Sequence, residues 1–233
     1  FRMMEKFAKD RRYLARDFDS ATKLVPVPRE ETKSYDVFSP EQLMRLFVML
    51  TKDEIAYVAV MAFAGARRAE AQRLTAAAFN LDEDSIRISR EIAKKKLPRN
   101  LAITPNLREW LALAPPPENG NLISSRHVAA ISRDDARLRT VGLPEWPNNI
   151  LRHSFLSYHL VKHAEPQTTA YRGGTSLKML EQHYVGLVTK RAADEWFGIT
   201  PQRVREFAAE KGLTELITWL SFDAPTQQER NQP

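Results

Sequence analysis

The chain has 233 residues, of which 43% are hydrophobic and 27% charged, and this composition predicts a folded protein with one sizeable core. Lysine and arginine outnumber aspartate and glutamate by 35 to 29, and the net charge of +6 favours a polyanionic partner such as nucleic acid, although a merely solvated basic face would give the same excess. Cysteine is absent, which excludes disulfides, thiolate catalysis and cysteine-based zinc sites and fits a reducing, cytoplasmic compartment.

The N-terminal part, residues 1–35, is predicted to contain one helix and a linker. Residues 3–18 place apolar side chains such as Phe7 among basic ones, a pattern suited to a helix that packs on one side. Residues 23–33 contain two prolines, which cannot continue a helix. The N-terminus has no apolar run typical of an export signal. Because the chain begins at Phe1 rather than at methionine, it is expected to be a fragment of a longer protein.

A second domain is predicted to begin at residue 36. Ser39 is a good N-cap, Pro40 suits the first helical position, and Gln42 can complete a capping box, so a helix should begin here. Residues 53–63 are apolar nearly all round and predict a deeply buried helix that ends at Gly65. The most apolar stretch, residues 55–66, is too short to cross a bilayer, and no membrane partner is expected.

A small basic hairpin and further helices are predicted to follow. Residues 85–89 and 100–104 alternate as strands do, and the lysines between them are by default a solvated turn. Helices are expected over residues 106–114, 126–141, 149–163, 166–172, 176–184 and 190–196, with two more between 201 and 220 before a polar tail. The fold class is therefore mainly α with a small antiparallel β-sheet.

Four separated segments together resemble the signature of the tyrosine-recombinase, or phage-integrase, family over about residues 37–198. They are a Gly-x-Arg-x-x-Glu box at 65–70, a lysine-bearing hairpin at 94–103, an Arg-His-Ser-Phe box at 152–155 and a tyrosine-bearing helix at 174–184. The resemblance implies the tyrosine-recombinase catalytic-domain fold for residues 36–198. Residues 1–35 would then be the end of a core-binding domain with its linker, and residues 199–233 a C-terminal helical extension with a disordered tail.

The resemblance also implies a reaction and assigns its residues. Tyr184 would attack a DNA phosphate to form a 3′-phosphotyrosyl intermediate, Arg67 and Arg152 would hold the non-bridging oxygens, and Lys94 would protonate the departing 5′-oxygen. No metal or other cofactor would be needed. The remaining candidates are Asn149 and Thr175 in the catalytic set, Lys95, Lys96, Arg99 and Arg68 as DNA contacts, and Glu70 and His153 as supporting residues.

Two positions depart from the family pattern. Asn149 stands where the family usually has histidine, and Thr175 where it has histidine or tryptophan. Neither side chain exchanges a proton near neutral pH, so base assistance to Tyr184 would be lost although phosphate orientation could survive. His153 and His183 are adjacent to key residues, but neighbouring positions on a helix point about 100° apart, so neither is expected to replace the missing group. His153 would otherwise be a satisfied core histidine.

Each match also has a plainer interpretation. Arg67 could merely pair with Glu70 at i, i+3. Asn149 and Thr175 could simply be helix N-caps. Tyr184 could be a core tyrosine. The order and spacing of the four segments together, rather than any one of them, favour the family.

Four functions remain compatible with the sequence. The first is a site-specific recombinase or integrase that cleaves and rejoins DNA, and the alternative is a catalytically impaired DNA-binding relative. A type IB topoisomerase shares the chemistry, and a helical protein-interaction module would not bind nucleic acid. The family implies double-stranded DNA as partner, a homotetramer on DNA with residues 190–196 as the element lent to a neighbouring subunit, and a nucleoid-associated cytoplasmic protein. The chain alone could be a monomer.

Overall fold

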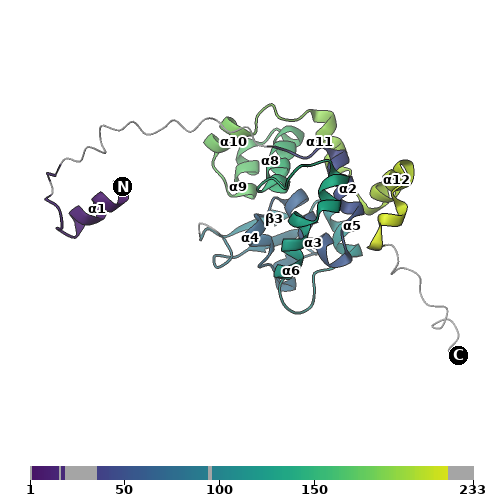
Figure 1. Ribbon diagram of the computed structural model, residues 1–233, viewed down its shortest axis with the longest axis horizontal. Coiled ribbons are helices and arrows are strands. Elements are labelled where there is room, and N and C mark those ends of the chain that lie inside the picture. Colours follow the sequence, from purple (N-terminus) through teal and green to yellow (C-terminus); the bar gives the residue numbers. More distant parts are fainter. Residues whose placement is uncertain (1, 16, 19–35, 94–95, 220–233) are drawn as a thin grey trace. The chain divides into compact units, whose positions relative to one another are not determined.

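The computed structural model describes residues 2–15, 17–18, 36–93 and 96–219, and the chain divides into two units, Phe1–Lys33 and Ser34–Pro233 (Figure 1). The first unit contains α1 (Arg2–Asp10). The helices of the second unit are α2 (Pro40–Val48), α3 (Lys52–Ala64), α4 (Arg68–Ala71), α5 (Pro105–Leu113), α6 (Ser125–Arg133), α7 (Asp135–Val141), α8 (Ile150–His163), α9 (Pro166–Gly173), α10 (Leu177–His183), α11 (Lys190–Phe197) and α12 (Pro201–Lys211). The 3-10 turns are η2 (Ala76–Ala78) and η3 (Thr214–Leu216), and the strands are β1 (Phe79–Asn80), β2 (Ser85–Ile88) and β3 (Arg99–Ala102).

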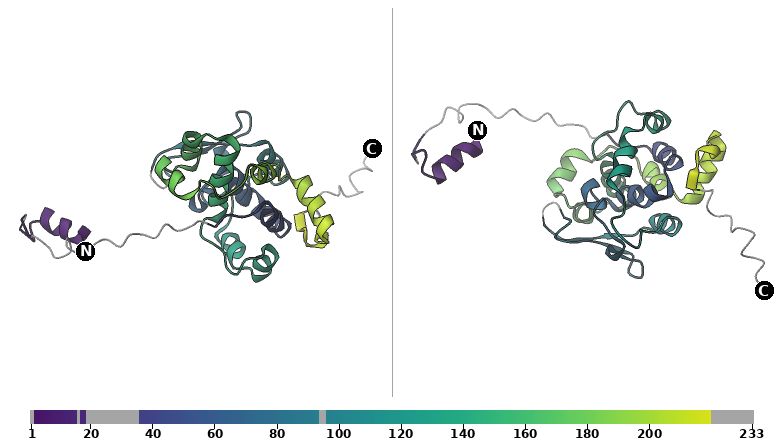
Figure 2. Two further views of the ribbon diagram at one scale, coloured as in Figure 1. Left: turned by 90° about the horizontal axis from the view of Figure 1, so that it is seen from above. Right: turned by 60° about the horizontal axis from the view of Figure 1, so that its bottom comes forward.

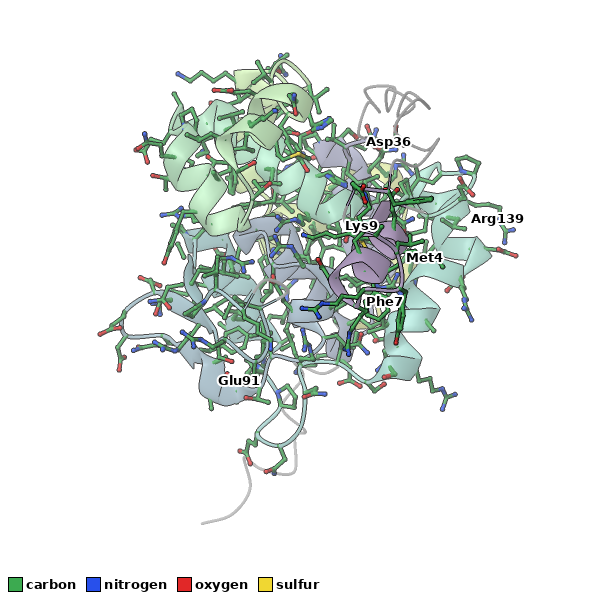
Figure 3. The ribbon with its side chains drawn as sticks, turned by 90° about the vertical axis from the view of Figure 1, so that its left-hand side faces the viewer. Met4, Phe7, Lys9, Asp36, Glu91 and Arg139 are labelled. Atoms are coloured by element: carbon green, nitrogen blue, oxygen red, sulfur yellow. The ribbon has the colours of Figure 1, made fainter. Side chains whose placement is uncertain are left out.

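Helix α1 is shorter than the helix predicted over residues 3–18. It ends two residues before Arg12, whose left-handed backbone (φ 59°) cannot continue a right-handed helix. Met4 and Phe7 of this helix are exposed, and Figure 3 labels both. The predicted linker, residues 23–33, lies outside the described residues.

The predicted start of the second domain's first helix is confirmed. The amide of Gln42 donates to Ser39 Oγ at 3.1 Å, and the amide of Ser39 donates to Gln42 Oε1 at 2.9 Å, which completes the capping box, with Pro40 at the first helical position. The buried face of α2 then reaches α5, where the ring of Phe47 stacks on Trp110 with centroids 4.0 Å apart. The local N-terminal signal and the apolar face thus fix both the start and the packing of α2.

Helix α3 lies at the centre of the second unit because it is apolar around its whole circumference. It packs against α5 and α8, and every residue from Glu54 to Ala64 is buried. The buried carboxylate of Glu54 is neutralised by Arg137 of α7, which donates to its two oxygens at 3.0 and 2.7 Å. Figure 1 shows α8, α9, α10 and α11 gathered together above the region of α3, α4 and β3.

The predicted hairpin is confirmed, and it belongs to an antiparallel sheet in the order β1-β2-β3. Ile86 pairs with Leu101 across β2 and β3, and both side chains are buried. Strand β1 was not predicted, because its two residues are too few to show an alternation. Lys94 and Lys95, which were predicted to lie at the turn, are outside the described residues, whereas Lys96 is exposed and left-handed (φ 54°).

Two of the predicted helices differ from the observed ones. The helix expected over residues 126–141 is two helices, α6 and α7, because Asp134 adopts an extended backbone and its carboxylate accepts from the amides of Ala136 and Arg137. Aspartate favours such an N-cap over a helix interior. Of the two helices expected between 201 and 220, the first is α12 and the second is only the 3-10 turn η3. The polar tail, residues 220–233, lies outside the described residues.

Helices α11 and α12 pack within their own chain. Trp196 of α11 is fully buried, donates to the carbonyl of Ala62 in α3 at 3.0 Å and stacks on Tyr158 of α8. Residues 190–196, predicted as the element lent to a neighbouring subunit, are thus anchored in the core of the single chain. Helix α12 contacts α2 and α5, and Figure 2 shows it in yellow at the edge of the helical body. Across the described part of the chain, every helix falls short of the length and apolarity that a membrane span needs.

Candidate functional site

Arg67 is positioned by a sharp turn between α3 and α4. Gly65 ends α3 in the left-handed conformation (φ 75°), and Arg67 occupies the N-cap position of α4. Its backbone amide donates to Glu70 Oε2 at 3.0 Å, and its Nη1 donates to Glu70 Oε1 at 2.7 Å. Its Nη2 donates to the carbonyl of Gly174. The plain pairing with Glu70 therefore exists, and the same guanidinium also reaches the segment that precedes Tyr184.

Arg152 reaches the same segment from the first turn of α8. It is buried, its Nη1 donates to the carbonyl of Gly65 at 2.8 Å, and its Nη2 donates to the carbonyl of Gly173. Burial, followed by the positive charge of Arg67, lowers the pKa of Arg152 to about 9, so it is still a cation at neutral pH. Two guanidinium groups thus donate to adjacent carbonyls at the end of α9.

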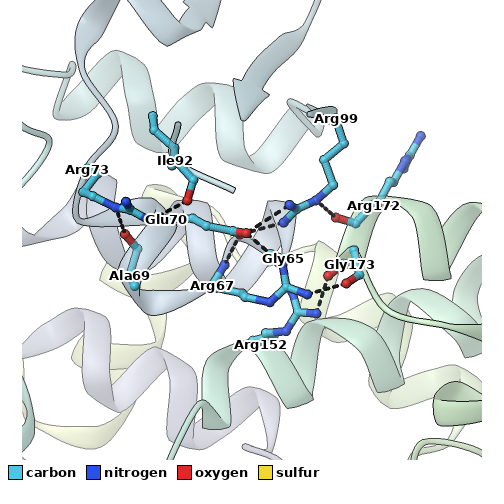
Figure 4. Close-up of polar contacts among 11 residues, drawn as sticks. Gly65, Arg67, Ala69, Glu70, Arg73, Ile92, Arg99, Arg152, Arg172 and Gly173 are labelled. Carbon is cyan, nitrogen blue, oxygen red and sulfur yellow. Dashed lines mark hydrogen bonds and ion pairs between the residues drawn. The ribbon is translucent and has the colours of Figure 1, made fainter. Parts of the chain in front are cut away.

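Glu70 is the fully buried carboxylate that joins Arg67 to the hairpin (Figure 4). Arg99 of β3 donates to its two oxygens at 3.1 and 2.7 Å and, through Nε, to the carbonyl of Arg172 at 2.8 Å. Burial by itself would raise the pKa of Glu70, but the hydrogen bonds from Arg99 and Arg67 outweigh it and lower the pKa to about 2. Arg99, predicted as a DNA contact, therefore faces the interior.

Tyr184 follows α10 as its C-cap residue and is buried. It packs in a small cluster with side chains of α8 and α9, among them Phe155. Its Oη lies 2.7 Å from Nδ1 of His153, and the two rings are stacked with centroids 5.6 Å apart and an interplanar angle of 27°. Burial, then the charges of Arg152 and His183, lower the pKa of His153 to about 4, so its ring is neutral at neutral pH.

A pocket of about 560 Å³ opens beside these groups. Its walls come from the α3 to α4 turn and from the start of α8, and they are formed by Arg67, Arg68, Ala69, Glu70, Gln72, Arg73, Asn149, Arg152 and His153. Both candidate phosphate-binding arginines and the histidine that touches Tyr184 therefore border one cavity. Within the described ranges, histidine and carboxylate side chains do not gather in threes that could hold a metal ion.

Comparison with known proteins identifies the fold. The sequence matches no family model and no curated protein. Among solved structures, the integrase from mycobacterium phage Brujita is 17% identical with a TM-score of 0.51, over 91% of this chain and 72% of that one. XerA recombinase is also 17% identical with a TM-score of 0.51, over 87% of this chain and 71% of that one. The chain has the tyrosine-recombinase fold. At this identity the likeness establishes the fold.

Asn149 and Thr175 were both plausible helix N-caps from the sequence, and neither side chain caps a helix in this tyrosine-recombinase fold. Asn149 occupies the N-cap position of α8 in a left-handed conformation (φ 57°), but its side chain makes no capping hydrogen bond, and it borders the pocket instead. Thr175 does not cap α10, because that position belongs to Ser176. The amide of Thr175 donates to the carbonyl of Ala170 at 2.9 Å and so helps to close the end of α9. Lys94 and Lys95 lie outside the described residues.

Several contacts of the recombinase-fold site were missed by the sequence prediction. The sequence did not predict the contact between His153 and Tyr184, which forms because the tyrosine approaches α8 from another segment, on the side that His153 faces. Arg73, which was not singled out, donates through Nε to the carbonyl of Ala69 at 2.9 Å and through Nη2 to that of Ile92 at 2.5 Å, and so ties α4 to the hairpin. Only the basic character of residues 67–73 hinted at this role.

Proposed function

We propose that this protein is a site-specific DNA recombinase or integrase that cleaves and rejoins DNA through a 3′-phosphotyrosyl intermediate. The observation that carries the proposal is the meeting of two separated segments at one cavity, with a third segment, which bears Tyr184, in contact with a residue that borders it. Arg67 and Arg152 border it from the α3 to α4 turn and from α8, and His153, on the same wall, touches the Tyr184 hydroxyl. The tyrosine-recombinase fold supports the same conclusion.

Arg67 and Arg152 act as the phosphate clamp. A phosphodiester under attack carries negative charge on its two non-bridging oxygens, and guanidinium groups match that charge with paired hydrogen bonds. Without DNA, these donors bind the carbonyls of Gly173 and Gly174 at the C-terminal end of α9, where the helix dipole is negative. When DNA binds, a phosphate takes the place of those carbonyls, and its full negative charge accepts hydrogen bonds from the same guanidinium groups.

Tyr184 acts as the nucleophile. Its Oη attacks phosphorus, the bond from phosphorus to the 5′-oxygen breaks, and the ester energy is kept in the phosphotyrosyl bond for the reverse step with another 5′-hydroxyl. Lys94, on the hairpin, is the proposed general acid for the departing oxygen. Because Tyr184 is only 5% exposed, the residues that cover it move before the tyrosine meets DNA, while its hydroxyl stays in contact with His153.

Covalent trapping tests the proposal. The probe is a pool of nicked DNA duplexes with randomised sequence around the nick, in which the short cleaved strand diffuses away and leaves the adduct. The full chain is expected to form an adduct that survives denaturing electrophoresis. Tyr184→Phe abolishes it, whereas Tyr13→Phe, which removes the hydroxyl of an exposed tyrosine, does not. An undiminished adduct in the Tyr184→Phe protein contradicts the proposal.

A second candidate function is a DNA-binding relative that has lost cleavage, and Asn149 and Thr175 are the substitutions that favour it. A relative of that kind binds DNA with strong salt dependence and forms no covalent adduct. Combined Asn149→His and Thr175→His substitutions distinguish the two functions when the unaltered chain is inactive. Cleavage gained by the double variant means that activity was lost through these positions, and continued absence of cleavage favours a purely binding role.

The proposed partner is double-stranded DNA, bound through the pocket and the basic hairpin. Lys95 and Lys96 on the hairpin and the exposed Arg68 at the pocket wall are the proposed backbone contacts. Assembly as a homotetramer on DNA and a nucleoid-associated location in the cytoplasm belong to the same proposal. Relaxation of supercoiled DNA without recombination would instead indicate a topoisomerase.

A further inference from the structure

We propose that His153 is a catalytic residue, whose Nδ1 accepts the proton of the Tyr184 hydroxyl as the tyrosine attacks phosphorus. The inference rests on the proposed function and deepens it, since it supplies the base that a histidine at position 149 would otherwise provide. It starts from a direct contact: Nδ1 of His153 lies 2.7 Å from the reacting oxygen. That distance is within the range in which a proton passes between heavy atoms.

The position of His153 on α8 makes this role geometrically consistent. Successive residues of a helix point about 100° apart. Arg152 therefore turns toward the carbonyls of Gly65 and Gly173, while His153 turns toward Tyr184. One helix turn thus provides a phosphate ligand and a proton acceptor that face two different parts of the same reaction. The stacked rings hold the imidazole edge against the hydroxyl.

The surroundings of His153 keep its ring ready to accept a proton. Burial and the neighbouring Arg152 and His183 lower the pKa of His153 to about 4, so the ring is neutral at neutral pH. For Nδ1 to accept from Tyr184, the neutral ring must carry its proton on Nε2. The groups that act on the ring are Arg152 on α8 itself and His183 and Tyr184 at the end of α10. The charged groups that border the same pocket are Arg67, Arg68, Glu70 and Arg73.

A bound phosphate strengthens this base. The positive charge of Arg152 is one of the causes that disfavour a protonated His153. A phosphate held by Arg152 adds a negative charge beside it, which offsets that repulsion and favours the imidazolium. His153 is therefore a poor base in the free protein and a better one when DNA occupies the clamp, so the tyrosine is activated where a phosphate is present to be attacked.

The proton and bond changes balance without another reactant. The bond from Tyr184 Oη to phosphorus forms, the hydroxyl proton passes to Nδ1 of His153, and the bond from phosphorus to the 5′-oxygen breaks. The departing oxygen takes a proton from the general acid, for which Lys94 is proposed. During rejoining, a 5′-hydroxyl attacks the phosphotyrosine and gives its proton to the deprotonated general acid, and the His153 imidazolium returns its proton to the leaving Tyr184 oxygen.

Nitrogen NMR of the free, full chain tests the contact independently of any cleavage. In protein labelled with ¹⁵N-histidine, we expect the His153 ring at neutral pH to carry its proton on Nε2 and to have an unprotonated, hydrogen-bonded Nδ1. The Nδ1 signal should shift in Tyr184→Phe, while the signals of His127, on α6, should stay unchanged. A proton on Nδ1, or an Nδ1 signal indifferent to Tyr184→Phe, overturns the inference.

Adduct kinetics test the role in the reaction. His153→Asn keeps an oxygen near the place of Nδ1 but cannot take up a proton, so the rate of adduct formation should fall by about 10²-fold or more. The decline in rate that the unaltered chain shows at acid pH, as His153 becomes protonated, should vanish in this variant. His127→Asn is the matched control and should change neither quantity. An unchanged rate and pH profile in a folded His153→Asn protein overturns the inference.

The two experiments keep failure of the inference separate from failure of the proposed function. If the unaltered chain forms an adduct and His153→Asn matches it, His153 is not the acceptor although the recombinase chemistry stands. If the unaltered chain forms no adduct, the proposed function fails, and the NMR result alone decides whether His153 accepts from Tyr184. Urea unfolding of each variant identifies any rate change that comes from misfolding.

Discussion

Arg99 of β3 and Glu70 of α4 form a bidentate ion pair in the interior, with nitrogen to oxygen distances of 3.1 and 2.7 Å. The remaining Nε of Arg99 donates to the carbonyl of Arg172 in α9. Glu70 also binds Arg67. Glu70 thus joins Arg99 of the hairpin to Arg67 of the candidate phosphate clamp. Both arginines also bind the segment leading to Tyr184, so changes at Glu70 should affect all three.

Glu70→Gln should destabilise the protein strongly. The substitution removes the charge that neutralises two arginines, and breaking a buried ion pair typically costs about 3 to 5 kcal/mol of unfolding free energy. Glu41→Gln is the matched control, because Glu41 pairs with Arg45 at 2.9 Å on the exposed face of α2, where such a pair is worth about 0.5 kcal/mol. Urea unfolding at neutral pH measures both changes. Equal, small losses in the two variants would show that the Glu70 network does not stabilise the fold.

The same carboxylate should make stability depend on acid pH. The pKa of Glu70 is lowered from 4.5 to about 2 in the folded state, so its contribution is fully present above about pH 4.5 and is lost as the pH falls toward 2. The shift corresponds to about 3 kcal/mol. The difference in unfolding free energy between the unaltered chain and Glu70→Gln should therefore shrink over that interval. A difference that stays constant from neutral pH down to about pH 2 contradicts the depressed pKa.

Much of the fold could be predicted from the sequence, because the patterns that specify its helices and strands are local. The capping box at Ser39 and Gln42, the all-apolar residues 53–63 and the alternating strands each depend on neighbours in the chain. The division of residues 126–141 at Asp134 was missed, because an aspartate within an otherwise helical pattern shows its capping role only once its carboxylate is seen to accept from the following amides.

The residue types of the candidate site could be predicted from the sequence, whereas several of its contacts could not. Arg67, Arg152 and Tyr184 were found from the order and spacing of motifs. The pairing of Arg99 with Glu70 and the contact of His153 with Tyr184 join segments 29 and 31 residues apart. Helical periodicity relates only residues of the same helix, so it could not predict which face of α8 the tyrosine would approach.

Gly65→Ala should destabilise the protein through a steric clash in addition to backbone strain. A Cβ at Gly65 would lie 2.3 Å from Cδ1 of Phe155, and the residue is left-handed (φ 75°). Gly142 has a similar φ of 78° with nothing within 4 Å of its added Cβ, so Gly142→Ala measures the strain alone, about 1 to 2 kcal/mol. Gly65→Ala should cost at least about 2 kcal/mol more in urea unfolding.

Replacing Phe155 with leucine in the Gly65→Ala background provides the companion measurement. The smaller side chain makes room for the added methyl group, so the double variant should recover part of the stability that Gly65→Ala loses. Strict additivity of the two single changes, or a Gly65→Ala cost no larger than that of Gly142→Ala, is incompatible with the observed approach of Phe155 to Gly65.

Arg152→Lys should slow adduct formation strongly, although the variant keeps the positive charge at this position. Lysine keeps the positive charge but lacks the planar fork that donates to the carbonyls of Gly65 and Gly173 and, by proposal, to phosphate. The rate of adduct formation should fall by about 10²- to 10³-fold, the usual effect of losing a donor that stabilises a transition state. Arg191→Lys, at an exposed pair with Glu195, is the control. A rate equal to that of the control contradicts the clamp.

Identification of the residue joined to DNA tests the central claim most directly. The adduct formed with the nicked duplex pool is digested with nuclease and protease, and mass spectrometry locates the residual nucleotide on a peptide. The proposed chemistry predicts one modified peptide, with a 3′-phosphate of the nucleotide esterified to Tyr184. Attachment to a different residue, or through the 5′-phosphate, would contradict Tyr184 as the nucleophile of a tyrosine recombinase.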